Sequence, residues 1–299
     1  MNLRILLPLL VLLFIPSGNF SAQQTPDPKQ AGLVMYAHSR NLSPNELNQL
    51  LSKAQTGDAE SQFWAGNTYA DGFLVAEDLE EAGRWWLKSA EHGYAPAQLA
   101  YGLMSRLTNA SVGERWMLRS AEQGHAEAQF WLGVAYDRNW FGTHDIQEAI
   151  KWYRKAAERG DPDAQVERGQ KYEDGEGVEQ DYKLAASWYR KAAEHVPDLG
   201  GAGQGRNRLA QLYMQGLGVP QDYVQACFWF SLNGQEEFAS EAKQHLSSSQ
   251  IRAVEVLIDE WKEQHRLSPE VAAAIQMLEA KSQYVKSPET ASSEARQVP

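Results

Sequence analysis

The sequence predicts an all-α fold, a right-handed α-solenoid of about five helix-turn-helix units with helical caps at its N- and C-terminal ends. Three observations support this prediction: a repeat of about 36 residues, apolar and small positions spaced as on one side of a helix, and glycine-containing turns between helices. A fixed period of this length is typical of stacked hairpins, in which each unit buries its apolar face against its neighbour.

The repeat is carried by a short motif that begins with a small residue and glutamine and ends with glycine. Its copies start 36, 31, 36 and 41 residues apart, at Ser61, Ala97, Ala128, Ala164 and Gly205. The motif falls in the first helix of each unit. Glycine inside a helix costs about 1 kcal/mol relative to alanine, so its recurrence predicts that a neighbouring backbone passes close to it.

A second set of positions marks the second helix of each unit. A tyrosine follows the motif glycine by three residues, and after a turn come an aspartate and, seven residues later, a tryptophan. The second unit keeps the tryptophan without the aspartate, and the recurring tryptophans are Trp85, Trp116, Trp152, Trp188 and Trp229. Aromatic residues at helical spacing are typical of a core, so we expect these side chains to pack between helices rather than to bind a cofactor.

Helix signals also flank the repeats. Ser43, Pro44 and Glu46 match an N-cap, a first-turn proline and a capping-box acid, which predicts a helix over about 44–55. After the last unit the sequence predicts a helix over 236–246, a longer helix capped by Ser247, and a further helix that begins after Ser268. Such end helices would cover the apolar faces of the terminal units.

Targeting signals and composition divide the chain further. Arg4 precedes an uncharged apolar run that is shorter than the roughly 20 residues of a membrane span, which predicts a signal peptide. The last segment is rich in Ser, Pro, Glu and Gln and has no apolar period, which predicts disorder. The predicted parts are a signal peptide (1–22), an N-terminal segment with a capping helix (23–57), five repeats (58–234), a C-terminal helical cap (235–285) and a disordered tail (286–299).

Charge and cysteine content exclude several classes of protein. The formal net charge of −11 disfavours a nucleic-acid partner, because backbone phosphates would be repelled. Cys227 is the only cysteine, so no internal disulfide can form and no lipidated cysteine follows the apolar run. With a signal peptide and no integral membrane span, we expect a periplasmic or secreted protein.

The repeated segments resemble the Sel-one-like repeat (SLR) family, a relative of the tetratricopeptide repeats. The resemblance covers about residues 58–234 and rests on residues 128–136, the turn 175–178 with Asp181, and the run 185–194. It implies a solenoid that interacts with other proteins. The departures from the family pattern are the missing Gly-x-Gly-Val turn of the second unit, Arg168 at a usually aliphatic position, and Ala210 in place of the fifth glycine.

The motifs of catalysis and metal binding are weak in this chain. The seven histidines are scattered and no cysteine pair exists, so we expect no metal site, no cofactor and no enzyme activity. Ser240 and Lys243 match the Ser-x-x-Lys element of penicillin-recognising enzymes, but its companion elements are missing. We interpret the glycine-rich run 200–205 as a flexible insertion and the acidic run 174–179 as a turn between helices.

The candidate binding residues lie at two positions of the first helices, three and seven residues after each motif start. In solenoids of the tetratricopeptide type these helices line the concave side, and residues there that do not repeat are candidates for partner contact. Tryptophan is common in interface hot spots, although the two tryptophans of this set could instead pack into the core. The partner-binding candidates are Trp64, Thr68, Met104, Trp131, Glu167, Lys171 and Arg208.

The favoured function is a non-catalytic scaffold or adaptor, exported to the bacterial periplasm or envelope, whose concave groove binds a protein or peptide segment. Two alternatives stay open. Resemblance to SLR proteins that have been associated with penicillin binding suggests a β-lactam-interacting, hydrolase-like protein, and a structural envelope or host-contact component is the other. The identity of the partner and the oligomeric state are not predicted by the sequence.

Overall fold

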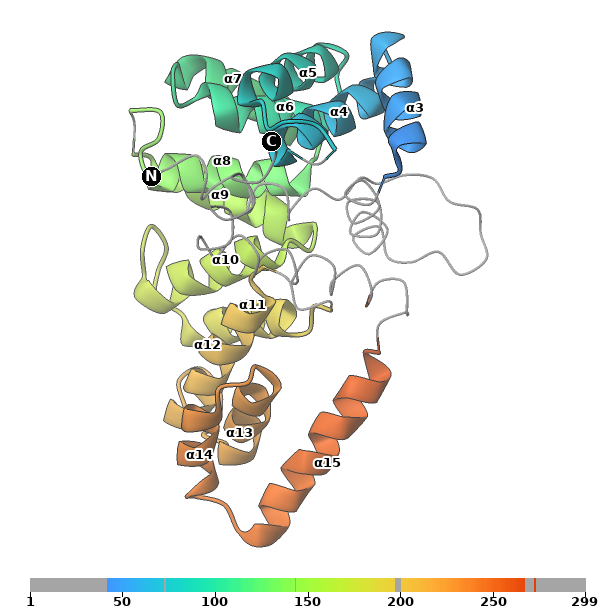
Figure 1. The fold of residues 1–299 in the computed structure, drawn as a ribbon. Coiled ribbons are helices and arrows are strands. Elements are labelled where there is room, and N and C mark those ends of the chain that lie inside the picture. Colours follow the sequence, from blue (N-terminus) through green and yellow to red (C-terminus); the bar gives the residue numbers. More distant parts are fainter. Residues whose placement is uncertain (1–41, 73, 143, 197–199, 267–271, 273–299) are drawn as a thin grey trace, which may run out of the picture.

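The computed structural model describes residues 42–72, 74–142, 144–196, 200–266 and 272, and these residues form helices with no strand among them. From Pro44 to Leu232 each helix packs against the next one along the chain, and the two helices that follow both pack against the helix Tyr223–Leu232. The fold therefore grows in one direction instead of closing into a globule (Figure 1). This arrangement confirms the all-α solenoid predicted from the repeat. Within the described residues, no helix has the length and apolar character that a membrane crossing requires.

Within the described ranges, five helical hairpins form the body of the solenoid and one helix precedes them. The preceding helix is α3 (Pro44–Gln55). The hairpins are α4 (Ala59–Asp71) with α5 (Leu79–Glu91), α6 (Ala95–Ser105) with α7 (Ala110–Glu122), α8 (Ala126–Asp137) with α9 (Ile146–Glu158), α10 (Pro162–Asp174) with α11 (Tyr182–Ala193), and α12 (Ala202–Gln215) with α13 (Tyr223–Leu232). Two further helices, α14 (Glu236–Lys243) and α15 (Ser248–Gln264), follow.

The recurring aspartate begins the second helix of four units. Its side chain accepts hydrogen bonds from two backbone N–H groups of the first turn, which have no partner within the helix. The backbone N–H of the aspartate donates to the carbonyl of the recurring tyrosine, so a hydrogen bond connects the end of the first helix to the start of the second. In the second unit, Asn109 caps α7 in its place. The aspartates are Asp78, Asp145, Asp181 and Asp222.

The recurring glutamine joins each hairpin to the helix before it. Its buried side-chain amide donates to a carbonyl at the end of the preceding helix, at distances of 3.0, 3.1, 2.9 and 3.2 Å. Carbonyls at a helix end lack a partner within the helix, so this bond satisfies a buried acceptor. In the fifth unit Arg206 Nε donates to Ala193 in the same way, at 3.0 Å. The glutamines are Gln62, Gln98, Gln129 and Gln165.

The motif glycines allow a close approach, but mostly of a side chain rather than of the backbone that the sequence predicted. A Cβ atom at Gly133 would lie 2.6 Å from the ring of Tyr153. A Cβ atom at Gly66 would lie 2.6 Å from Trp86 Nε1. In the first, third and fourth units the contacting residue directly follows the recurring tryptophan, so the second helix packs an aromatic ring against the glycine of its own first helix. In the second unit the contacting side chain is Met117, and a Cβ atom at Gly102 would also lie 3.0 Å from the backbone nitrogen of Met117. A Cβ atom at Gly66 would likewise lie 3.1 Å from the carbonyl oxygen of Ala82.

The two ends of the described chain agree in part with the sequence. The capping box of Ser43 and Glu46 is confirmed, and Ser247 begins α15 with a second capping box. The helix predicted over 236–246 ends at Lys243. On α15 only Val254 is fully buried, whereas Leu257 is 38 % exposed, so the apolar side of this helix is incompletely covered. The signal peptide, the helix after Ser268 and the tail lie outside the described residues.

The glycine-rich run before the fifth unit is not the flexible insertion that we predicted. Gly201 and Gly205 are buried, and α12 begins between them. A Cβ atom at Gly205 would lie 2.7 Å from the methyl group of Ala192, and one at Gly201 would meet the backbone of Pro162. These glycines therefore allow α12 to pack closely on α10 and α11 despite the longer link.

Candidate functional site

Three of the seven candidate residues are buried and not open to a partner, which for Trp64 agrees with the alternative of packing into the core. Trp64, Thr68 and Lys171 are each 5 % exposed. Trp64 belongs to the core cluster of the first units and lies edge-on to Phe63. The hydroxyl of Thr68 donates to the carbonyl of Trp64 at 2.9 Å, a bond within one helix that explains why this polar group is buried.

The other four candidates are half-buried and differ in character along the solenoid. Met104 and Trp131 pack against the core cluster of the first units. Burial raises the pKa of Glu167 above its ordinary value, although Lys171 opposes this effect. Arg208 lies 3.9 Å from a carboxylate oxygen of Glu173. The candidate surface is therefore apolar and aromatic on α6 and α8, and charged on α10 and α12.

The charged part is centred on an ion-pair network around Lys171. Its ammonium group lies 3.0 Å from Asp137 at the end of α8 and 2.7 Å from Glu176 in the turn after α10. Burial lowers the pKa of Lys171, but the hydrogen bonds that its ammonium group donates to Glu176 and Asp137 outweigh burial, so the pKa lies above its ordinary value. Lys171 thus joins the third unit to the fourth and is not available to a partner.

A cluster of possible metal ligands overlaps this network. Asp137, His144 and Glu176 bring one ligand atom each within 4.8 Å of one another. The ammonium group of Lys171 already contacts both carboxylates and supplies the positive charge that they need. A divalent cation would have to displace a buried, doubly hydrogen-bonded lysine, so the geometry favours an ion-pair site over a metal site.

The aromatic part contains a pair of stacked tryptophans. The rings of Trp131 on α8 and Trp140 in the α8–α9 loop have centroids 5.8 Å apart and planes inclined by 25°. Both rings are half-buried and rest on the core cluster of the first units. The guanidinium of Arg106, at the end of α6, lies 3.8 Å from the ring centroid of Trp140. We call Arg106, Trp131 and Trp140 the aromatic platform.

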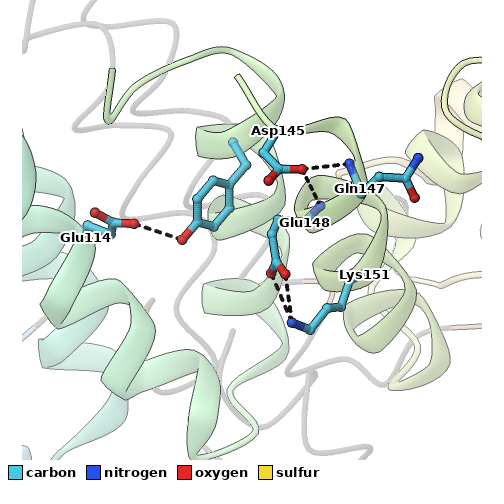
Figure 2. Close-up of polar contacts among 6 residues, drawn as sticks. Glu114, Asp145, Gln147, Glu148 and Lys151 are labelled. Atoms are coloured by element: carbon cyan, nitrogen blue, oxygen red, sulfur yellow. Dashed lines mark hydrogen bonds and ion pairs between the residues drawn. The ribbon is translucent and has the colours of Figure 1, made fainter. Parts of the chain in front are cut away.

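The α8–α9 loop that carries Trp140 is fixed at several points. The backbone N–H of Trp140 donates to the carbonyl of Ala135 at 2.8 Å, and Asp145 caps α9 at the other end of the loop (Figure 2). The hydroxyl of Tyr136 donates to Glu114 on α7 at 2.8 Å, and the tyrosine ring lies edge-on to Phe141. The position of the Trp140 ring is therefore set before any partner binds.

Comparison with known families agrees with this architecture. The sequence profile of the Sel1 repeat matches residues 59–94, 97–125, 126–161, 162–195 and 204–232, which together make up more than half of the chain. The chain belongs to the Sel1 repeat family. This result confirms the resemblance inferred from the sequence, and Sel1 repeat proteins are generally non-catalytic scaffolds that mediate protein–protein interaction.

Solved structures of Sel1 repeat proteins resemble this chain. One from Oxalobacter formigenes has a TM-score of 0.53 and 24 % identity, and the match covers 83 % of this chain and 91 % of that one. A protective antigen of uropathogenic Escherichia coli with an SLR fold has a TM-score of 0.46 and 25 % identity, and the match covers 86 % of this chain and 64 % of the antigen. A Sel1 repeat protein from Klebsiella pneumoniae has a TM-score of 0.43 and 19 % identity, and the match covers 66 % of this chain and 96 % of that one. Comparison with curated proteins gave no match.

The Sel1 repeat pattern itself explains which site residues the sequence analysis missed. Arg106 and Trp140 lie in the links between helices, outside the two positions that were surveyed. A usable signal was present, because the second repeat is five residues shorter than the 36-residue period and Trp140 is a tryptophan that no other repeat shares.

Proposed function

We propose that this Sel1 repeat protein is an exported, non-catalytic scaffold that binds a segment of another protein at the aromatic platform. The observation that carries this proposal is the stack of Trp131 on Trp140, two half-buried tryptophans at positions where the repeats differ. The recurring tryptophans are accounted for by packing between helices. The platform tryptophans are held on rigid elements and keep part of their surface accessible.

Such a surface suits peptide recognition. Tryptophan and arginine dominate interface hot spots, and both are present within one stacked group. Because the loop and helix that carry them are fixed by hydrogen bonds, most of the ordering cost on binding falls on the partner segment. We therefore expect the partner segment to bind reversibly and with moderate affinity, which is compatible with an adaptor role.

Export to the periplasm is part of this proposal. It is supported by Arg4 and the uncharged run that follows it, which have the plan of a cleavable signal peptide. Expression of the full chain with a periplasmic reporter at its C-terminus tests this step. Retention of an uncleaved, cytoplasmic product would contradict it.

Capture from the native envelope tests binding. The double variant Trp131→Ala, Trp140→Ala should lose partners that the unaltered chain retains, while its helical circular-dichroism signal persists. Phe238→Ala, which removes an exposed aromatic ring from α14, is the matched control and should retain the same partners. Equal capture by the double variant and the control would overturn the proposal.

The rival proposal of β-lactam binding rests on Ser240 and Lys243. Both lie on α14, outside the five repeats, and Ser240 is exposed to solvent. Incubation with a labelled β-lactam distinguishes the two proposals. Covalent labelling that disappears in Ser240→Ala would favour the rival.

A further inference from the structure

Arg106 carries a positive charge that no acidic side chain balances among the described residues. The ion pairs found in that part of the chain do not include it, and its Nε atom is enclosed without a hydrogen-bond partner. Burial alone lowers the pKa of its guanidinium, since no charged neighbour acts on it appreciably. Within the described part of the chain, Arg106 is therefore a partly desolvated cation without an ion-pair partner, and its guanidinium lies over the ring of Trp140.

This environment results from a deviation in the repeat. Four residues separate α6 from α7, whereas seven or eight separate the two helices of every other unit. The short link brings Arg106 so close to α7 that only glycine fits opposite it, and Gly113 occupies that position. On the other side, Trp140 of the next unit lies over the guanidinium of Arg106.

The guanidinium suits a carboxylate better than other anions here. Its planar fork pairs with the two oxygens of a carboxylate while its face remains stacked on an indole ring. A doubly charged phosphate would call for more than one cation, and the chain as a whole carries a net charge of −11. Partial burial of Arg106 strengthens an ion pair with a carboxylate, because water screens the two charges less.

We propose that Arg106 binds the carboxylate of an Asp or Glu side chain in the partner segment, and that an apolar residue beside this acid lies on Trp131. The apolar neighbours of the arginine support the second part of this proposal. Leu107, next in the chain, is 47 % exposed, and Met104 on the same helix is half-buried. This inference rests on the proposed function, since it names the chemistry that the platform recognises.

Selection from a phage-displayed random-peptide library on the full chain tests the inference. We expect the selected peptides to place Asp or Glu beside an aromatic or branched aliphatic residue. Arg106→Gln should weaken the binding of synthetic copies roughly tenfold or more, which is the usual value of a hydrogen bond to a charged group. Arg106→Lys, which keeps the charge but loses the planar fork, should weaken binding by a smaller factor.

Two matched controls make the result specific. Arg119→Gln removes another arginine that lies over a tryptophan, 4.6 Å from the ring of Trp116 on exposed α7 surface, and should leave binding unchanged. Replacing the acid of the peptide by its amide should weaken binding to the unaltered chain and have no further effect on Arg106→Gln, because both changes remove one interaction.

The outcomes separate this inference from the proposed function. Peptides that depend on Trp131 and Trp140 but bind Arg106→Gln as well as the unaltered chain would overturn the carboxylate inference alone. A selection that yields no peptide sensitive to loss of the two tryptophans would overturn the platform as a binding site as well.

Discussion

The guanidinium carbon of Arg106 lies over the indole of Trp140, 3.8 Å from the ring centroid, although the two residues belong to different repeats. The contact joins the end of α6, in the repeat with the shortest link, to the α8–α9 loop. A cation over an indole contributes about 0.5–2 kcal/mol, depending on how far it is desolvated. The same contact therefore stabilises the junction of two repeats and presents a positive charge at the platform.

The motif glycines should be intolerant of even a methyl group. Gly133→Ala would place its Cβ atom 2.6 Å from the ring of Tyr153, so either the ring or the helix must shift. We expect a loss of about 1–3 kcal/mol in the free energy of unfolding, measured by urea denaturation. Combining it with Tyr153→Leu, which removes the ring, should cost less than the sum of the two single changes. Additive losses would show that the ring is not the obstacle.

The recurring glutamines should each contribute to stability through one buried hydrogen bond. Gln129→Leu removes the donor to the carbonyl of Ala121, 2.9 Å away, and leaves that buried acceptor without its side-chain partner. The expected loss is about 1–3 kcal/mol in the free energy of unfolding. Gln204→Leu on the exposed surface of α12 is the control and should change stability by less than about 0.5 kcal/mol.

These two residues show how much of the fold the sequence predicts. The period of the Gln–Gly motif and the helical spacing around it were sufficient to predict the hairpins and their order, whereas the capping role of the recurring aspartates came from the structure. The role of Gln129 was not predicted, because a pattern in one chain does not reveal which distant carbonyl a side chain reaches. The partner of Gly133 was predicted wrongly as backbone, since a recurring glycine indicates close approach without identifying the approaching atom.

The candidate site was less predictable for a physical reason. The sequence identifies which side of a helix a residue lies on, but Trp64 and Trp131 occupy equivalent positions and differ in burial. Trp140 and Arg106 lie in two links between helices, and a pattern within one repeat does not reveal that a side chain of the next repeat reaches it.

Glu127 should make stability depend on pH in an unusual direction. Burial, and secondarily the charge of Asp161, raise the pKa of this carboxyl well above 4.5. Below pH 4.5 the carboxyl of Glu127 is protonated in both the folded and the unfolded chain, so it does not lower the free energy of unfolding. As the pH rises, the unfolded chain releases the proton first, so this group lowers the stability of the fold progressively toward neutral pH.

Glu127→Gln should therefore stabilise the protein near pH 7.5, by about 1–3 kcal/mol, and have little effect near pH 4. Thermal unfolding of both proteins across this range measures the difference. Burial lowers the pKa of His125 to about 4, but this group titrates in both proteins and cancels in the comparison. A difference that is constant with pH would show that Glu127 is ionised in the folded chain.

The ion-pair network around Lys171 should contribute far more to the free energy of unfolding than a surface ion pair of similar geometry. Lys171→Met leaves the mostly buried carboxylate of Asp137 without its cationic partner, although the hydroxyl of Tyr153 still donates to it at 3.2 Å. A buried charge without a counter-charge is costly. We expect a loss of about 1–3 kcal/mol in the free energy of unfolding, because Glu176 is half-exposed and partly solvated. Denaturation in urea measures this loss.

Lys151→Met provides the matched control for this prediction. Lys151 pairs with Glu148 at 2.9 Å on the exposed surface of α9 (Figure 2), where water solvates both groups. Loss of this exposed ion pair should lower the free energy of unfolding by no more than about 0.5 kcal/mol. The double variant Lys171→Met, Asp137→Asn should recover part of the stability, because the second change removes the unpaired charge. If Lys171→Met and Lys151→Met cost the same, the network stabilises the junction of the third and fourth repeats no more than solvent-exposed pairs do.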